Sequence, residues 1–390
     1  MKILMLAPEP FFQPRGTPIS VYFRIKALSD LGHEVDLITY PLGENVNIER
    51  LKILRIPNLF LLKKIKIGPS FIKPPLDILL FSQAVFQLAK KRYDAIFTHE
   101  EAALLGAFLG KIFRVPHIYD MHSSLPQQLE NFNFSRSRLL KAIFIGMENY
   151  YLKNSQAVIV ICQDLLEKVR RDGYESKAIL IENFLDFPSP KFSAEQISAK
   201  RLEFAPHGEK IVLYAGNFQP YQGLPLLLEA AAKLNQKVIF VLVGGAGEEL
   251  EEMKNRASAL AISDRVVFVD KVPPSSVPLF ISLADVLVSP RLSGTNTPLK
   301  IYSYLKSGKP LVATNLWTHT QVLNEKISVL VNPTAESLAQ GLSFALSSEA
   351  ANERAREAKE LSEREYTYSN YLSKIRSCLE IAGENFKNKN

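Results

Sequence analysis

The stretch from Ser289 to Asn315 holds the residue types and spacing that best suit the binding of an anion. It contains a small polar turn, formed by Ser293, Gly294, Thr295, Asn296 and Thr297. Thr297 or Asn296 can cap a helix that we expect from Leu299 to Ser307, because Pro298 suits the first helical position and Gly308 the residue that ends it. Backbone N–H groups and the positive end of the helix dipole would then bind a phosphate or a sugar hydroxyl.

Lys300 falls in the first turn of this expected helix, where a cation opposes the helix dipole. The position becomes favourable when a phosphate or carboxylate lies close by, so Lys300 is a candidate ligand for an anionic group. Alternatively, Lys300 extends its ammonium group into water, and the segment is an ordinary capped helix of an α/β protein. The local pattern leaves these alternatives open.

Two further residues stand next to expected strands in the first half of the chain. His122 follows an expected strand over 117–119 and is the best candidate for an active-site histidine, with a purely structural histidine as the alternative. The remaining histidines have no comparable setting: His33, His99, His117, His207 and His319. Gly16 lies between the first strand and its helix, where a glycine lets the backbone approach a ligand closely or serves the local conformation only.

Length and composition predict a globular protein of two domains. A chain of 390 residues exceeds the size at which one hydrophobic core keeps growing. Hydrophobic residues make up 47% and charged residues 22%, which excludes wholesale disorder. Cys162 and Cys378 are too few for a disulfide framework, so a reducing cytoplasm is compatible. The first ten residues suggest a buried strand instead of a secretory signal, and no apolar run reaches the ~18 residues of a spanning helix.

Apolar runs alternate with helical stretches, which predicts an α/β fold with two doubly wound parallel sheets. Strands are expected at 3–7, 34–40, 95–98, 117–119, 158–161 and 178–181, and then at 211–215, 237–243, 266–269, 286–289, 310–313 and 328–331. We expect an N-terminal domain over 1–186, a linker over 187–208 and a second domain over 209–365. Ligands bind beyond the carboxyl ends of such strands, and two such edges could face each other across a cleft.

The stretch 51–76 concentrates positive charge among apolar residues. It has no acidic residue and six basic ones: Lys52, Arg55, Lys63, Lys64, Lys66 and Lys73. Such a stretch can contact an anionic membrane surface, or it can pack on its own domain with the lysines in water. Nucleic acid is a poorer explanation, because no recognised nucleic-acid-binding motif accompanies it.

The segment PLKIYSYLKSGKPLVAT, residues 298–314, resembles the donor-site signature of the retaining GT-B glycosyltransferases of family 4, and the likeness covers nearly the whole chain. The resemblance implies two Rossmann-like domains facing across a cleft, with the last helix, 366–390, packing back on the first domain. It implies transfer of a sugar from a nucleotide-sugar donor to a glycan or lipid-linked acceptor, in polysaccharide or glycolipid synthesis. Such a protein would be cytoplasmic and peripheral to the membrane.

The resemblance also assigns roles to individual residues. Contacts to the reacting sugar would come from His122 and Gly16. Contacts to the diphosphate would come from Asn217, Gln222 and Lys300. Contacts to the sugar and ribose would come from the turn that contains Gly294, namely from Thr295, Asn296, Thr297, Leu299 and Ser303. The nucleotide would also meet the loop that contains Gly245, and its base the backbone of Lys271 and Val272.

This sequence departs from the family pattern at four of these positions. Thr295 and Ser303 stand where the family has two glutamates, and Asn217 and Gln222 stand where it has an arginine and a lysine. Amides supply no charge, so phosphate neutralisation would fall on helix N-termini, Lys300 or Arg291. A differently bound nucleotide sugar, a donor that is not a nucleoside diphosphate sugar, and a non-catalytic binding relative all remain open.

The sequence predicts no metal site. It has no D-x-D pair, and no His, Cys or Asp cluster has the spacing of metal ligands. No paired carboxylates are evident either, which disfavours an epimerase on the same fold. We therefore expect a metal-independent transferase without a cofactor.

Overall fold

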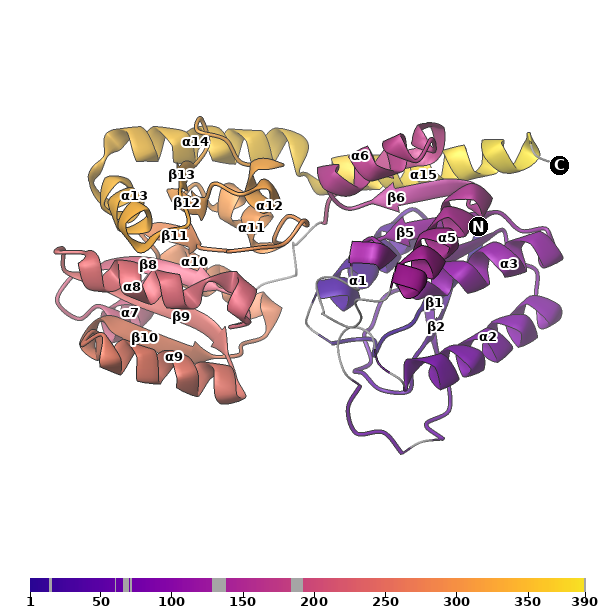
Figure 1. The fold of residues 1–390 in the computed structure, drawn as a ribbon, viewed down its shortest axis with the longest axis horizontal. Coiled ribbons are helices and arrows are strands. Elements are labelled where there is room, and N and C mark those ends of the chain that lie inside the picture. Colours follow the sequence, from indigo (N-terminus) through magenta and orange to yellow (C-terminus); the bar gives the residue numbers. More distant parts are fainter. Residues whose placement is uncertain are drawn as a thin grey trace. The chain divides into compact units, whose positions relative to one another are not determined.

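The computed structural model describes residues 1–13, 16–59, 61–65, 70, 72–127, 138–183 and 192–388. The chain divides into two compact units. The N-terminal unit consists of Met1–Phe184 and Tyr368–Asn390, and the C-terminal unit of Leu185–Thr367. Each unit is built around one parallel β-sheet with helices packed against it (Figure 1).

The sheet of the N-terminal unit has seven described strands, all parallel to their neighbours. In sheet order they are β3 (Leu51–Arg55), β2 (Glu34–Thr39), β1 (Lys2–Ala7), β4 (Ala95–His99), β5 (His117–Met121), β6 (Ala157–Val160) and β7 (Ala178–Leu180). The inner strands are continuously apolar or nearly so, because helices cover both faces of the sheet.

Six described α-helices belong to this unit. They are α1 (Gly16–Asp30), α2 (Lys73–Lys90), α3 (Ala103–Phe113), α5 (Arg138–Asn154), α6 (Gln163–Arg171) and α15 (Tyr368–Lys387). Leu4 and Leu6 of β1 pack with α2 and α3, and Tyr119 and Met121 of β5 pack with α5 and α6. Asp120 points to the opposite face, because side chains alternate along a strand, and there it meets α1.

The sheet of the C-terminal unit has six described strands, again all parallel. In sheet order they are β10 (Val266–Asp270), β9 (Val238–Gly245), β8 (Lys210–Ala215), β11 (Val286–Ser289), β12 (Leu311–Thr314) and β13 (Val329–Val331). The helices are α7 (Ala194–Phe204), α8 (Leu224–Lys233), α9 (Gly247–Ala259), α10 (Val277–Leu283), α11 (Lys300–Ser307), α12 (Trp317–Thr320), α13 (Ala335–Ser347) and α14 (Glu349–Glu365).

Strict alternation of side chains builds two hydrophobic layers on this second sheet. Val212 and Val288 join the layer under α8, α9 and α13, whereas Leu213 and Leu287 join the layer under α10 and α11. The predicted fold class, α/β with two doubly wound Rossmann-like sheets, is confirmed.

The stretch 51–76 contains a strand that the sequence did not predict. Its first five residues form the edge strand β3, which pairs with β2. Arg55 donates hydrogen bonds to the carbonyl oxygen of Phe11 at 2.7 Å and to Asn45 Oδ1 at 2.8 Å, so its charge serves the unit itself. Lys63 and Lys64 are exposed, while Lys66 lies outside the described residues. The strand escaped prediction because it is short and carries two basic residues.

Candidate functional site

The strand order of the C-terminal sheet reverses between β8 and β11, and the loops after these two strands meet. Leu292 N donates to Tyr221 O at 2.9 Å, which joins the loops. Gly223 has a φ of +74°, and a Cβ atom there would lie 2.0 Å from the carbonyl oxygen of Pro290. Only glycine allows this approach. Doubly wound sheets bind their ligands at such a reversal point.

Lys300, the first residue of α11, points back toward the loop that follows β8. Its Nζ donates to Gln222 Oε1 at 3.4 Å and lies 3.7 Å from the centroid of the Tyr214 ring. A Cβ atom on Gly216 would come within 2.8 Å of Nζ, so glycine makes room for the ammonium group. Part of the residue remains accessible, while its charged end is enclosed by these groups.

The electrostatic setting of Lys300 is unfavourable for its charge. Burial lowers the pKa of Lys300 well below its usual range, and the neighbouring cation of Arg291 lowers it further. Among the residues that the structure describes, no carboxylate contributes to this pKa. The Arg291 guanidinium stacks on Tyr221, 5.1 Å from the ring centroid, and donates to the carbonyl oxygen of Ser293 at 2.8 Å. Two cations without a carboxylate form a site that a bound anion would complete.

Asn217 and Gln222 lie beside this lysine. Gln222 Nε2 donates to Asn217 Oδ1 at 3.3 Å, and Tyr214 Oη donates to Asn217 O at 2.6 Å. Gln222 therefore links Asn217 to Lys300. The structure brings together the three residues that the sequence predicts at the diphosphate.

The polar turn before α11 is held by the segment around α12. Gln321 Nε2 donates to Thr295 O, and Thr318 Oγ1 donates to Asn296 O, both at 2.6 Å. Gly294 has a φ of +119°, and a Cβ atom there would lie 2.7 Å from the Arg291 guanidinium. The position of the Arg291 guanidinium therefore requires a glycine at position 294 of the turn.

The predicted cap of α11 is absent, which leaves a buried hydroxyl group. The helix begins at Lys300 with Leu299 in the cap position, and no side chain caps it. Thr297 is only 7% exposed, and its Oγ1 has no hydrogen-bond partner among the described residues. A buried hydroxyl without a partner is costly, and a ligand could satisfy it.

The other predicted nucleotide contacts lie farther from this group of side chains. Gly245 ends β9, where a Cβ atom would lie 2.7 Å from the Phe218 ring, so packing alone accounts for this glycine. Lys271 is exposed and Val272 half-buried, and both follow the edge strand β10, two strands away from β8. Ser303 is half-buried on α11.

In the N-terminal unit, His122 directly follows β5 and meets the end of β4. His99 and Asp120 are register partners on these two strands. His99 Nδ1 lies 3.1 Å from His122 Nε2, and each ring lies 3.5 Å from an oxygen of the Asp120 carboxylate. All three residues are buried. The interpretation that His99 lacks a comparable setting was therefore wrong, because parallel pairing brings together residues that are distant in the sequence.

A buried arginine balances the charge of this cluster. Arg24 Nε donates to Asp120 Oδ2 at 2.8 Å, and both side chains are fully buried. Burial alone would raise the pKa of Asp120, but Arg24 and the two histidines outweigh it and lower the pKa below the usual range. Burial lowers the pKa of His99 to about 3, so this ring stays neutral.

His99, Asp120 and His122 also form a possible metal site that the sequence did not reveal. Their ligand atoms lie within 4.8 Å of one another, although the residues come from two strands and show no ligand spacing in the sequence. Two imidazoles and a carboxylate are suitable ligands for a transition metal. Arg24, however, already supplies positive charge to Asp120, so the cluster is electrostatically complete without an ion.

Glu100 is a further residue that the sequence did not single out. It follows β4 as His122 follows β5, and it has a φ of +49°, a left-handed conformation that is uncommon for glutamate. Ser123 Oγ donates to Glu100 Oε2 at 3.1 Å, and burial raises the pKa of Glu100. A left-handed backbone conformation at a residue with a half-buried carboxyl group is typical of binding sites. Gly16 begins α1, where a Cβ atom would meet nothing within 4 Å, so the unit itself does not require glycine there.

Two family models match the chain in sequence. The model described as Glycosyltransferase Family 4 matches residues 14–187, and the model described as glycosyl transferases group 1 matches residues 196–362. This chain is a family 4, group 1 glycosyltransferase. As predicted from residues 298–314, it belongs to the enzymes of the GT-B type.

The glycosyltransferase is similar in sequence to two lipid-modifying enzymes. It is 24% identical to a phosphatidyl-myo-inositol mannosyltransferase of Mycolicibacterium smegmatis, over 83% of this chain and 78% of the relative. It is also 24% identical to an alpha-monoglucosyldiacylglycerol synthase of Streptococcus pneumoniae, over 80% of this chain and 71% of the relative. By their names, both relatives act in glycolipid synthesis.

Solved structures show the same fold. Sucrose-phosphate synthase from Thermosynechococcus elongatus superposes with a TM-score of 0.76 at 21% identity, over 96% of this chain and 97% of that chain. Anabaena HepE in complex with UDP superposes with a TM-score of 0.76 at 18% identity, over 97% of this chain and 100% of that chain. Within the described ranges, no helix of the glycosyltransferase has the length and apolar character needed to cross a membrane.

Proposed function

We propose that this glycosyltransferase moves a sugar, with retention of anomeric configuration, from a nucleotide-sugar donor to a glycan or lipid-linked acceptor. The single observation that carries the proposal is the enclosed ammonium group of Lys300 beside Arg291, two cations that no carboxylate compensates among the described residues. A donor diphosphate would restore the usual pKa of Lys300 and would bind at the strand-order reversal that ligands prefer.

The proposed donor contacts follow from the geometry of the C-terminal unit. Lys300 would stabilise the departing nucleoside diphosphate, and Asn217 and Gln222 would donate hydrogen bonds to it. Thr297 would offer its unsatisfied hydroxyl group to the sugar or ribose. HepE, which shares the fold, was crystallised with UDP and with UDP-glucose, which supports a nucleotide-sugar donor for this chain.

The positive charge needed for departure of the leaving group would come from the protein itself. Lys300 and the N-terminal end of α11 supply it, so we propose that the reaction needs no divalent metal. Activity that is unchanged by a chelator would support this expectation, and activity restored only by Mg²⁺ or Mn²⁺ would contradict it.

In the N-terminal unit, His122 would hydrogen-bond the reacting sugar from its place directly after β5. His99 and Asp120 would orient the ring, because both lie within 3.5 Å of it. The loop at Gly16 would pass close to the transferred sugar. We propose a cytoplasmic enzyme at the inner face of the membrane, since the two matched relatives modify lipids by their names.

The decisive experiment is slow hydrolysis of a panel of nucleotide sugars without acceptor. Release of free sugar from one donor would show a working donor site, while the acceptor is still unknown. A second candidate function is a non-catalytic relative that binds a nucleotide sugar or a glycan. It is favoured by the four positions at which this sequence departs from the family pattern: Asn217, Gln222, Thr295 and Ser303. Thermal stabilisation by UDP without any hydrolysis, and without transfer to added acceptors, would support that second candidate and contradict the first.

A further inference from the structure

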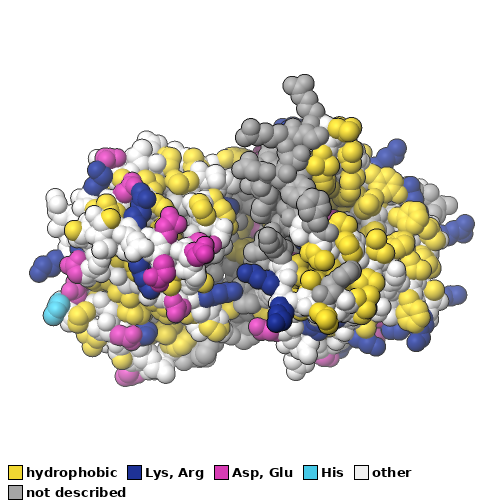
Figure 2. Space-filling view, turned by 60° about the horizontal axis from the view of Figure 1, so that its bottom comes forward, with side chains coloured by type: hydrophobic (Ala, Val, Ile, Leu, Met, Phe, Trp, Pro, Cys, Tyr) yellow, Lys and Arg dark blue, Asp and Glu magenta, His cyan; other side chains and the backbone are white. Residues whose placement is uncertain are grey.

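One side of the N-terminal unit exposes an unusual number of large apolar side chains. Eight of them lie on the three helices α2, α3 and α5: Ile78, Phe86, Leu104, Phe108, Ile112, Leu139, Ile143 and Ile145. We call this surface the α2/α3/α5 face. Figure 2 shows hydrophobic side chains gathered over the N-terminal unit, with Lys and Arg at the margin. Scattered apolar residues are ordinary on a protein surface, but a contiguous group marks a binding surface.

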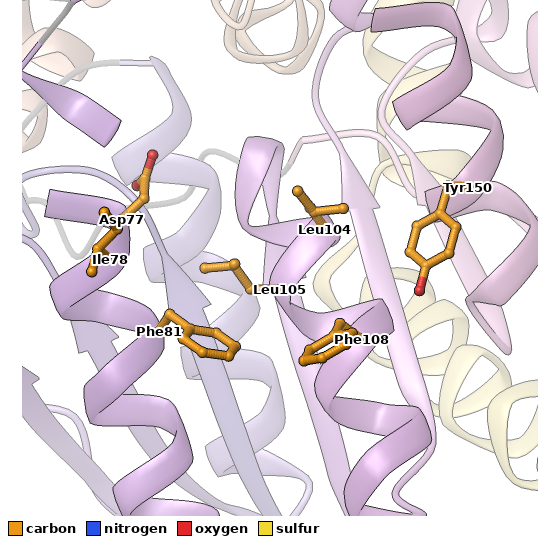
Figure 3. Close-up of a pocket in the computed structure, with 7 residues that line it drawn as sticks. All are labelled: Asp77, Ile78, Phe81, Leu104, Leu105, Phe108 and Tyr150. Carbon is orange, nitrogen blue, oxygen red and sulfur yellow. The ribbon is translucent and has the colours of Figure 1, made fainter. Parts of the chain in front are cut away.

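An open trough joins the three helices into one surface. It has a volume of about 410 Å³ and is lined by Asp77, Ile78, Phe81, Leu104, Leu105, Phe108 and Tyr150 (Figure 3). The Phe81 ring of α2 and the Phe108 ring of α3 lie 6.2 Å apart between their centroids. Its lining is almost wholly apolar, so a hydrocarbon chain fits its chemistry better than a sugar or a nucleotide does.

Positive charges outnumber negative ones on the three helices of this face. Asp77 and Glu148 are the only acidic residues of the three helices. Glu148 is buried and paired with Lys168, and Asp77 accepts a hydrogen bond from Tyr40 Oη, while burial raises the pKa of Asp77 to about 7. Neither group therefore presents a free negative charge at the surface.

Basic residues, in contrast, surround the apolar centre. The exposed ones on or directly after the three helices are Lys90, Lys111, Arg114, Lys141 and Lys153. Lys90 lies 5.7 Å from the ring of Phe86, and Lys111 lies 5.4 Å from the ring of Tyr150. Both ammonium groups therefore lie over aromatic rings of the α2/α3/α5 face, so positive charge stands directly beside its apolar side chains.

We propose that the α2/α3/α5 face rests on a lipid bilayer that contains anionic headgroups, with a lipid hydrocarbon chain in the trough. An apolar centre, a rim of cations and the lack of exposed carboxylates on these helices match the layers of an anionic membrane surface. A soluble partner with acidic groups would match the rim but not the apolar centre. This inference rests on the proposed function, because a lipid-linked acceptor would lie in the membrane. It assigns the membrane contact to α2, α3 and α5 instead of to the stretch 51–76.

The test is sedimentation with vesicles of phosphatidylcholine alone or mixed with phosphatidylglycerol. The double variant Ile78→Ser, Phe108→Ser should bind the anionic vesicles about tenfold more weakly than the unmodified protein. The matched control is Leu202→Ser, Phe344→Ser, which removes two exposed apolar side chains from the C-terminal unit and should bind normally. Circular dichroism would verify that both variants are folded.

A charge test complements the apolar one. Lys90→Gln, Lys111→Gln should weaken binding to anionic vesicles about threefold to tenfold, and high salt should have the same effect. Lys237→Gln, Lys326→Gln changes the net charge equally, at exposed positions of the C-terminal unit, and should have little effect. Equal binding of the two charge variants would contradict the proposed rim.

Other outcomes overturn the proposal as a whole. Absence of vesicle binding by the unmodified protein, or normal binding by Ile78→Ser, Phe108→Ser, would do so. A dimer in sedimentation equilibrium that this variant abolishes, without vesicle binding, would assign the face to a second copy of the chain. Ile78→Ser, Phe108→Ser should hydrolyse the donor at the normal rate when no vesicles are present. If the unmodified protein hydrolyses no donor, that result contradicts the proposed function and not the proposed membrane surface.

Discussion

The two units each bury a cation near the end of a central strand, but they treat its charge in opposite ways. Arg24 is fully buried against Asp120, and this ion pair keeps both groups ionised. Lys300 is enclosed by Tyr214 and Gln222, and burial together with Arg291 lowers its pKa. One cation has its counter-ion within the fold, whereas the described residues provide none for the other.

The difference distinguishes a structural charge from a functional one. Breaking a buried ion pair leaves an uncompensated charge, so the Arg24 pair should matter for folding. A desolvated cation without a partner costs stability, and it persists where a ligand supplies the missing charge. The N-terminal cluster should therefore respond to substitution through stability, and the C-terminal loops through donor binding.

The largest expected effect is on the stability of the N-terminal unit. Asp120→Ala should destabilise it by about 3 to 5 kcal/mol, because Arg24 would remain buried without a counter-ion. Urea unfolding followed by circular dichroism would measure this loss, while fluorescence of Trp317, the single tryptophan, would report the C-terminal unit separately. Glu203→Ala removes an exposed ion pair with Lys200 and should cost at most about 1 kcal/mol. Equal losses of unfolding free energy in Asp120→Ala and Glu203→Ala would show that the Arg24–Asp120 ion pair adds no special stability.

Next in size is the loss of donor binding at Lys300. Lys300→Met should reduce kcat/KM for donor hydrolysis about 100-fold, because the leaving diphosphate loses a charge-assisted bond. The melting temperature should stay the same or rise, since a desolvated cation is removed. Lys306→Met changes an exposed lysine on the same helix and serves as the control. A marked fall in melting temperature with unaltered donor affinity would make Lys300 structural.

Acid should weaken both units through their buried histidines, although in the N-terminal unit the raised pKa of Asp77 opposes the loss. Burial lowers the pKa of His99 and His117 to about 3, and that of His319 in the C-terminal unit to about 4. Below the unfolded pKa of ~6.5, the unfolded state binds protons that the native histidines do not, so each histidine removes up to about 1.4 kcal/mol per pH unit as the pH falls.

The measurement is urea unfolding between pH 7 and pH 4, followed by the same two signals. The Trp317 fluorescence transition, which follows the C-terminal unit, should move to lower urea concentration as the pH falls, because native His319 stays neutral. His207→Gln, at an exposed position, should leave both pH profiles unchanged. A fluorescence transition that is unchanged between pH 7 and pH 4 would contradict the lowered pKa of His319.

The smallest expected effect concerns the unsatisfied hydroxyl of Thr297. Thr297→Val should stabilise the protein without ligand by about 1 kcal/mol, because it removes a buried polar group that has no partner. Donor affinity should fall about fivefold, measured by titration calorimetry, if that hydroxyl binds the donor. Thr318→Val is the control, because its hydroxyl already donates to Asn296 O, and it should lower stability instead. Unchanged affinity in Thr297→Val would remove Thr297 from the donor site.

Much of the C-terminal site was predictable because its geometry is local. The loop, helix and strand over 289–315 follow one another directly, so capping and turn preferences indicate where Lys300 must lie. The meeting of Lys300 with Asn217 and Gln222 follows from the sheet topology, since loops after neighbouring strands start at the same edge. The missing cap at Thr297 was not predictable, because hydrogen bonds from α12 and Gln321 hold the turn.

The amino-acid sequence by itself determined the alternation of strands and helices, the two-domain organisation and the family signature. These properties depend on side-chain periodicity and on short-range backbone preferences, which the sequence displays directly. Only the tertiary structure decided that His99 joins His122, that Arg24 compensates Asp120 and that α2, α3 and α5 share an apolar face. Each of these depends on contacts between segments far apart in the chain, which β-strand pairing and helix packing bring together.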